Sequence, residues 1–178
     1  MTYRKGLLQV YTGNGEGMAM AAAGQALRAA GQGFRVRVIE FLQGNSERSA
    51  LRTALVGQGG ITINELGQHT ASITEAPELA DSGLAQQALD AAEAATASGE
   101  YDLVILDQVN LALEWKLIEL HDLLSILRHK HEKVEVILTG SCAHPEVIAL
   151  ADLVTEMRQV KGSARTGTVP CWQIGPRN

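Results

Sequence analysis

A glycine-rich segment follows the first apolar run of the chain, in a place where phosphate-binding loops occur. The apolar run is residues 7–11, and the segment that follows consists of Thr12, Gly13, Asn14, Gly15, Glu16, Gly17, Met18 and Ala19. When a strand, a glycine loop and a helix follow in this order, backbone N–H groups and the helix N-terminus can point at one anion. Residues 12–19 are therefore a candidate nucleotide site.

The side chains of this loop are unsuited to a triphosphate. The phosphate-loop pattern ends in Lys and Ser/Thr, which neutralise phosphate charge and hold Mg²⁺. Here those positions are Met18 and Ala19, and Glu16 adds a carboxylate. A carboxylate a few ångströms from a phosphate costs on the order of a few kcal/mol at an effective dielectric of about 20. Two interpretations remain: a loop that only connects strand to helix, and an altered mode of nucleotide binding.

A second group of polar residues follows two apolar runs further along the chain. Asp107 ends the first run, where open α/β sheets place ligands, and it is a candidate metal ligand. Gln108 can donate a hydrogen bond but cannot replace a carboxylate at Mg²⁺. Asn110 either lines a crevice or lies on a solvated helix face. After the next run, Thr139, Gly140 and Ser141 are further crevice candidates.

Three more residues have chemistry that their surroundings leave undecided. Cys142 and His144 follow the Thr139–Gly140 turn. A Cys/His pair could be nucleophilic or bind metal, but no third orienting group is identifiable. Trp172 lies in a tail that is otherwise poor in apolar residues, and it could pack against a partner or against the edge of the sheet.

The composition excludes several classes of protein. The chain has 178 residues, 46% of them hydrophobic and 20% charged, which is typical of one globular domain spanning residues 1–178. A net charge of −5 argues against binding to nucleic acid. The two cysteines have no CxxC spacing, so we expect a reducing compartment, the cytoplasm. The sequence shows neither a signal peptide nor a run of about 18 apolar residues, so we expect no membrane insertion.

Predicted strands and helices alternate along the chain. The predicted strands are residues 7–11, 34–41, 61–66, 103–106, 134–138 and, weakly, 171–174; the predicted helices are 19–30, 46–55, 84–97, 111–128 and 145–151. This order predicts an α/β fold with three layers, in which helices cover both faces of a mostly parallel sheet. The charged and apolar alternation of residues 35–38 predicts a strand near an edge. Residues 56–83 form the weakest predicted region, which we expect to be mobile or irregular.

Several segments together resemble the ATP:corrinoid adenosyltransferases of the cobalamin pathway. The resembling segments are residues 12–15 (TGNG), 26–33, 41–44 (FLQG), 101–113 (YDLVILDQVNLAL), 138–140 (LTG) and 151–161 (ADLVTEMRQVK), within a region of about residues 5–162. The resemblance implies a P-loop NTPase or RecA-like fold, a cytoplasmic homodimer, and transfer of the 5′-deoxyadenosyl group of ATP to a reduced corrinoid with Mg²⁺. Residues 101–113 would contain the Walker B strand of that family.

The residues that this chemistry needs are changed here. The family's phosphate-loop lysine, the threonine beside it and the Walker B glutamate fall on Met18, Ala19 and Gln108, and two further basic positions fall on Glu16 and Ser141. Asp107 alone remains of the implied metal site. On the corrinoid side, the family's aromatic residues are replaced at Ile63 or Asn64 and at Leu89, and its closing motif is replaced within the variant tail, residues 162–178.

These changes lead to three hypotheses. The first is a pseudoenzyme that has lost ATP-dependent adenosylation, needs no cofactor, and serves a binding, scaffolding or regulatory role with an unknown protein partner. The second is an active enzyme that uses ATP, Mg²⁺ and a reduced corrinoid through the backbone amides of residues 13–19, Asp107 and a cation from a partner subunit. The third is a sensor of a small ligand.

Overall fold

The described part of the chain is built on one sheet of six parallel strands. The computed structural model describes residues 5–14, 17–42, 55, 57–64 and 82–161. The strands are β1 (Leu8–Gly13), β2 (Val36–Glu40), β3 (Ile61–Asn64), β4 (Leu103–Asp107), β5 (Glu135–Thr139) and β6 (Leu153–Met157), in the spatial order β3-β2-β4-β5-β1-β6. The helices are α1 (Gly17–Gly31), α3 (Ser82–Ser98), α4 (Val109–Glu114), α5 (Leu120–His129) and α6 (Pro145–Leu150).

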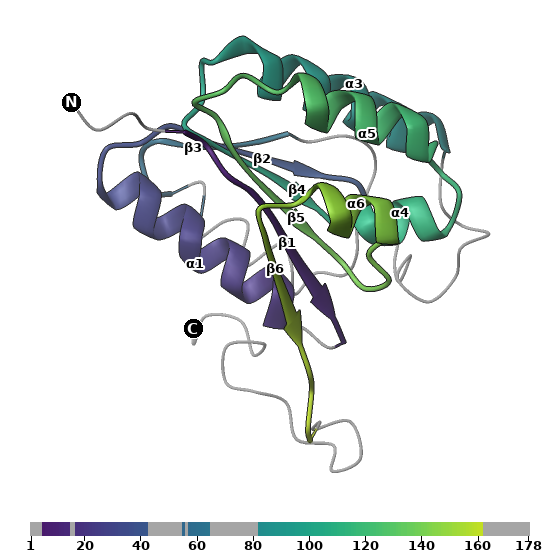
Figure 1. Cartoon of the computed structure of the whole chain (residues 1–178). Helices are drawn as coiled ribbons and strands as arrows, with labels where there is room; N and C mark the ends of the chain where they lie inside the picture. Colours follow the sequence, from purple (N-terminus) through teal and green to yellow (C-terminus); the bar gives the residue numbers. More distant parts are fainter. Residues whose placement is uncertain (1–4, 15–16, 43–54, 56, 65–81, 162–178) are drawn as a thin grey trace.

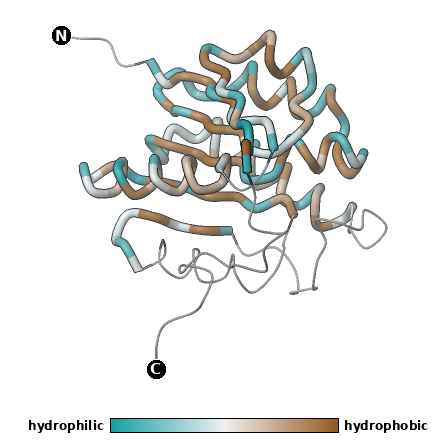
Figure 2. Tube along the Cα trace, turned by 90° about the horizontal axis from the view of Figure 1, so that it is seen from below, coloured by the Kyte–Doolittle hydropathy of each residue, from teal (hydrophilic) through white to brown (hydrophobic). Residues whose placement is uncertain are grey.

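The helices cover the two faces of the sheet unequally. Helix α1 lies on one face, and α3, α5, α4 and α6 lie on the other (Figure 1). Alternate residues of β4 point to opposite faces, so Val104 and Leu106 enter the core under α3 and α5, whereas Leu103 and Ile105 enter the core under α1. Along the helices, hydrophobic and hydrophilic residues alternate, as expected when one side of each helix is buried (Figure 2). The predicted three-layer α/β fold is confirmed.

The single helix predicted over residues 111–128 is wrong, because the chain forms α4 and α5 with a break between them. The N–H of Leu117 donates to the carbonyl of Ala112, and that of Lys116 to Leu113, which together form a Schellman ending of α4. Lys116 takes the left-handed conformation (φ 57°) that glycine usually supplies at this position. The sequence carries no glycine there to mark the break.

Strand β6 was not predicted from the sequence. It lies at the edge of the sheet beside β1, and four of its five residues are exposed. It therefore does not need the continuous apolar run by which the central strands were predicted. Strand β2, which contains the predicted edge-like segment, lies one strand inside the opposite edge. There Arg37 is half-buried, with its guanidinium 5.8 Å from the centre of the Tyr101 ring.

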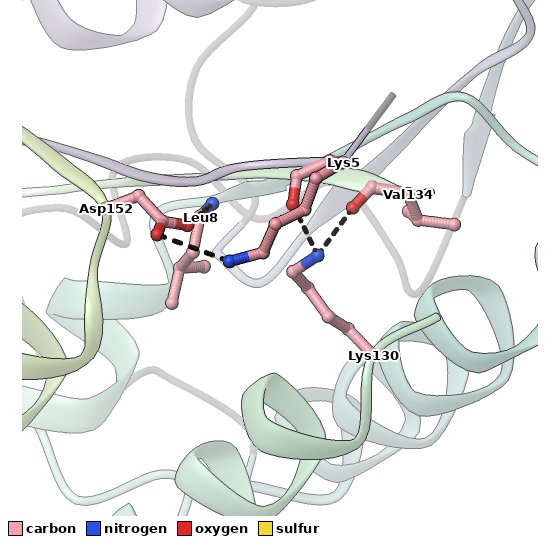
Figure 3. A network of polar contacts seen from close by, with 6 residues as sticks. Lys5, Leu8, Lys130, Val134 and Asp152 are labelled. Carbon is pink, nitrogen blue, oxygen red and sulfur yellow. Dashed lines mark hydrogen bonds and ion pairs between the residues drawn. The ribbon is translucent and has the colours of Figure 1, made fainter. Parts of the chain in front are cut away.

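A polar network ties together the starts of β1, β5 and β6 (Figure 3). The half-buried ammonium of Lys130 donates to the carbonyl oxygens of Gly6 (2.7 Å) and Val134 (2.9 Å). The carboxylate of Asp152 accepts from the backbone N–H of Leu8 at 2.8 Å. Burial lowers the pKa of Lys130, and the charge of Asp152 partly opposes this shift. The network fixes the N-terminal edge of the sheet, away from the candidate site.

Other predicted segments lie wholly or partly outside the described residues. Within the region predicted as mobile or irregular, residues 57–60 form a turn and residues 61–64 form β3, inside the predicted strand 61–66. Residues 56 and 65–81 lie outside the described residues, and the mobility of the region stays a prediction. Of the predicted helix 46–55, only Leu55 is described, and it is buried. The tail 162–178, with the weak strand at 171–174 and Trp172, lies outside as well.

Candidate functional site

The candidate residues gather where the parallel strands end at their carboxyl edge. Asp107 ends β4 and Thr139 ends β5, the strand beside it. Glu40 ends β2 and is the register partner of Asp107. In-register residues on neighbouring strands share a face, and the buried residues two positions before each of these three belong to the core under α1. All three side chains therefore lie on the face of the sheet that α1 covers.

Asp107 and Gln108 are held to the neighbouring strand through one hydroxyl group. Thr139 Oγ1 donates to Asp107 Oδ1 at 2.6 Å and accepts from the backbone N–H of Gln108 at 2.9 Å. Gln108 is buried and takes a left-handed conformation (φ 61°) at the start of α4. The hydroxyl of Thr139 thus fixes the positions of Asp107 and Gln108, so these candidate residues at the ends of β4 and β5 lie together.

The loop after β1 is joined to two other loops at its first residues. Thr12 Oγ1 accepts from the N–H of Ala143 at 3.3 Å. The backbone N–H of Asn14 donates to the carbonyl of Met157 at 2.9 Å, and the Asn14 side-chain oxygen accepts from the N–H of Gln159 at 2.6 Å. Gly13 has φ 117°, and a Cβ there would lie 2.1 Å from the Met157 carbonyl oxygen. The entry to the loop is thus fixed against the end of β6, and only glycine fits at position 13.

The first turn of α1 points the side chain of Met18 into the core. Met18 is 4% exposed and belongs to the apolar cluster between α1 and the sheet, whereas Ala19 is half-buried. Gly17 lies beside Met157, whose sulfur would be 3.3 Å from an added Cβ. The predicted loop residues Gly15 and Glu16 lie outside the described residues.

Beneath this loop, a buried phenol is part of the same face. Tyr11 pairs with Thr139 in register, and its hydroxyl donates to Gln9 Oε1 at 3.0 Å. Burial raises the pKa of Tyr11, and a hydrogen bond with Gln25 partly opposes this shift. The phenol therefore stays neutral at physiological pH and adds no charge to the site.

Asn110 is fully buried, so the interpretation of a solvated helix face is wrong for this residue. Its Nδ2 donates to the carbonyl of Gly140 at 3.2 Å, and its Oδ1 has no hydrogen-bond partner among the described residues. Gly140 has φ 123°, and an added Cβ would lie 3.2 Å from the Asn110 Cβ. Asn110 thus stabilises the turn after β5 through this hydrogen bond to Gly140.

The Cys/His pair does not form a nucleophile and base. Cys142 is an exposed free thiol with φ 59°, and Ser141 before it is half-buried. His144 precedes α6, and its Nδ1 accepts from the N–H of Glu146 at 3.3 Å, so the ring caps that helix. His144 is thereby given a local structural role.

The residues at this edge do not fit a Mg²⁺–triphosphate complex. Asp107 could supply one oxygen ligand, but Met18 and Ala19 carry neither the ammonium nor the hydroxyl, and Gln108 is not a carboxylate. Within the described ranges, no group of three or more His, Cys, Asp and Glu side chains could hold a metal ion. Sequence reasoning missed Glu40; its signal was an acidic residue near the end of an apolar run.

The sheet is all-parallel, with a glycine-containing loop between β1 and α1 and an aspartate at the end of β4, which is the arrangement of a P-loop NTPase-like fold. The KaiC-like protein PH0186 of Pyrococcus horikoshii OT3 has the same general fold, with a TM-score of 0.56 at 14% identity over 86% of this chain and 72% of that one. This similarity shows the fold alone.

Sequence comparison then gives the family. A model of the ATP:corrinoid adenosyltransferase BtuR/CobO/CobP family matches residues 4–171, and the chain belongs to this family. It is 30% identical to the corrinoid adenosyltransferase of Escherichia coli K12 over 92% of this chain and 82% of the relative. It is also 30% identical to that of Pseudomonas aeruginosa, over 92% and 80%. No helix among the described residues is long and apolar enough to cross a membrane.

Proposed function

We propose that this chain is a pseudoenzyme of the family, which has lost ATP-dependent corrinoid adenosylation and acts as a binding, scaffolding or regulatory protein. The observation that carries the proposal is the burial of Met18. The side chain at the position of the phosphate-loop lysine is 4% exposed and packs in the apolar core. The first turn of α1 therefore contributes to folding through a group that cannot neutralise phosphate.

The charge at the carboxyl edge of the sheet supports the same proposal. Glu40 and Asp107 lie in register on adjacent strands, whose axes are about 4.8 Å apart, and share one face. Neither Met18 nor Ala19 supplies the positive charge that a polyphosphate would need at this edge. Phosphoryl and nucleotidyl sites depend on preorganised positive charge at the phosphates.

The polar network at this edge gives the Asp107 carboxylate a structural role. Asp107 Oδ1 accepts the short hydrogen bond from Thr139, and the same hydroxyl holds the N–H of Gln108. These contacts join the ends of β4 and β5, and this structural role accounts for Asp107 without catalysis.

The test is a single-turnover adenosylation assay on the full chain. The protein is mixed anaerobically, in excess, with ATP, Mg²⁺ and a cob(I)alamin substrate, and formation of the cobalt–carbon bond is followed by absorbance. The Escherichia coli relative, named as a corrinoid adenosyltransferase, is the matched positive control.

The proposal predicts no adenosylated corrinoid from this chain under conditions in which the control converts its substrate fully. ATP-dependent formation of the cobalt–carbon bond would contradict it and would favour the atypical enzyme. A titration of cob(II)alamin without ATP then separates two kinds of binding protein. A saturable spectral change indicates a retained corrinoid site, and its absence directs attention to a protein partner.

A further inference from the structure

Strand β6 leaves one edge of the sheet open, and part of this edge is apolar. Among the described strands, β6 pairs with β1 alone. Leu153 is 47% exposed and Val154 is 38% exposed. Soluble proteins usually shield such an edge with charges, proline, a bulge or a covering segment, because its unpaired backbone groups can pair with another strand. The five residues of β6 include one charged side chain, Glu156, and no proline.

The pairing with β1 identifies the backbone groups that face the open edge. The carbonyl of Met157 accepts from the N–H of Asn14, so Met157 turns its backbone groups towards β1. Successive residues of a strand turn their N–H and C=O groups to alternate edges. Val154 and Glu156 therefore direct these groups outward, where a further strand can pair with them.

The side chains of β6 alternate between the two faces of the sheet. Met157 packs against the core under α1, so Leu153 lies on that same face and Val154 lies on the other. An added strand with its apolar side chains on the α1 face would therefore shield Leu153, the more exposed of the two.

The chain itself supplies a segment of this kind after β6. It bends at Val160 and Lys161, shortly after the strand, and residues 162–178 follow with glycines at positions 162 and 167. The large apolar side chains of this tail lie within residues 169–174 (VPCWQI), which contain the strand that the sequence weakly predicts. Residues 158–170 separate β6 from that strand and are long enough to reverse the direction of the chain.

We propose that residues 171–174 add to the sheet as a further strand, antiparallel to β6, and so close its open edge. The position of Pro170 determines which backbone groups pair. Proline has no N–H, so its position turns its backbone groups away from the neighbouring strand. Cys171 and Gln173 then turn their N–H and C=O groups towards the outward groups of β6.

This pairing also determines the faces on which the tail side chains lie. Residues that exchange hydrogen bonds across an antiparallel pair lie opposite one another, and their side chains share a face. Cys171 and Gln173 therefore lie on the face of Val154. Trp172 and Ile174 lie on the α1 face, beside Leu153. The proline thus selects the one arrangement that brings the two largest apolar side chains of the tail to the exposed leucine.

Charge favours the same occupant. The tail carries Arg165 and Arg177 and no acidic residue, whereas β6 contains Glu156 and is preceded by Asp152. The antiparallel direction takes Arg177 towards Asp152, whose side chain is 37% exposed. Because the tail is tethered to β6, it also reaches the edge at a higher effective concentration than a separate chain does.

The test is backbone amide hydrogen exchange of the full chain, measured by NMR. The N–H groups of Val154 and Glu156 should exchange at least about 100-fold more slowly than in an unstructured peptide, because the added strand accepts from both. Gln173→Pro removes an N–H that pairs with β6, and it should speed both exchange rates at least about tenfold. Gln173→Ala keeps that N–H and is the matched control, which should leave both rates within about threefold of the wild type.

A second measurement places the tail directly. Nuclear Overhauser contacts between the Trp172 ring and the Leu153 methyl groups are expected in the wild type and in Gln173→Ala. They should be lost in Gln173→Pro.

Three results would overturn the proposal. The first is rapid exchange of Val154 and Glu156 in the wild type. The second is protection that Gln173→Pro and Gln173→Ala leave equally intact, which would mean that something other than the tail covers the edge. The third is protection that disappears on dilution, which would place a second copy there. None of these results depends on whether the chain binds ATP.

Discussion

Restoring the phosphate-loop lysine at position 18 should damage the fold before it improves nucleotide binding. Met18 is 4% exposed within the core under α1, whereas Met20, two residues further along the same helix, is 43% exposed. Met18→Lys therefore places a long cationic side chain where an apolar one is buried. Met20→Lys makes the same chemical change at the surface and is the matched control.

The expected cost follows from the burial of the two side chains. Removing a fully buried methionine loses about 1.5–3 kcal/mol of transfer free energy, and the ammonium must bend towards water or lose its charge. We therefore expect Met18→Lys to lower the free energy of unfolding by about 3 kcal/mol. At about 2–4 °C per kcal/mol for a chain of this length, the melting temperature falls by about 6–12 °C. Met20→Lys should change stability by no more than about 0.5 kcal/mol.

The assay is urea denaturation of both variants and the wild type, followed by thermal scans with and without MgATP. The reasoning is refuted if Met18→Lys is as stable as Met20→Lys and its melting temperature rises with MgATP. That result would mean that the side chain at position 18 leaves the core readily to reach an anion. The loop would then be a phosphate site that lacks only its cation.

Three further predictions concern the residues around the site. Gly13→Ala should destabilise the protein by at least about 2 kcal/mol, because φ is 117° there and the new Cβ would lie 2.1 Å from the Met157 carbonyl oxygen. Gly24→Ala is the control: there is open space around its Cβ, so it should stabilise α1 by about 0.5–1 kcal/mol. Denaturant titrations of both variants check these values. Asn110→Asp should lower the free energy of unfolding by about 3 kcal/mol at neutral pH, because it buries an unpaired carboxylate. This destabilisation should become smaller in acid, where the carboxylate is protonated. An unchanged midpoint of urea unfolding at neutral pH would contradict the burial argument. Tyr11 has a raised pKa in the folded protein, so its contribution to stability is complete below pH 10.0 and declines as the pH rises towards the folded pKa. Tyr11→Phe should lack this alkaline decline when the free energy of unfolding in urea is plotted against pH. Equal slopes of that plot for the variant and the wild type would count against the prediction.

The central strands could be predicted because a strand that is buried on both faces has an apolar residue at every position. The apolar run Leu103–Leu106 lies at the middle of the sheet, where both faces are covered by helices, so every position is apolar. Strand β6 could not be predicted in the same way, since an exposed edge strand needs no such run. The break between α4 and α5 was hidden because Lys116 adopts the conformation that a glycine would have indicated.

The candidate site divides in a similar way. Asp107, Thr139 and the start of the loop could be placed because parallel strands end at a common edge, so residues that follow apolar runs meet there. The burial of Met18 and Asn110 could not be predicted, because the sequence does not reveal which side of a helix start faces the core. Glu40 was missed for a related reason, since its importance comes from being in register with Asp107 on a strand distant in sequence.

The central claim is that this family member no longer binds ATP for chemistry, and the most direct test is a thermal unfolding scan of the wild type with and without saturating MgATP. A ligand at about 100 times its dissociation constant adds about 2.7 kcal/mol of stability, which raises the melting temperature by about 5–11 °C for a chain of this length. We predict that MgATP leaves the melting temperature unchanged. A rise of about 5–11 °C would contradict the claim and show that the altered loop still binds nucleotide.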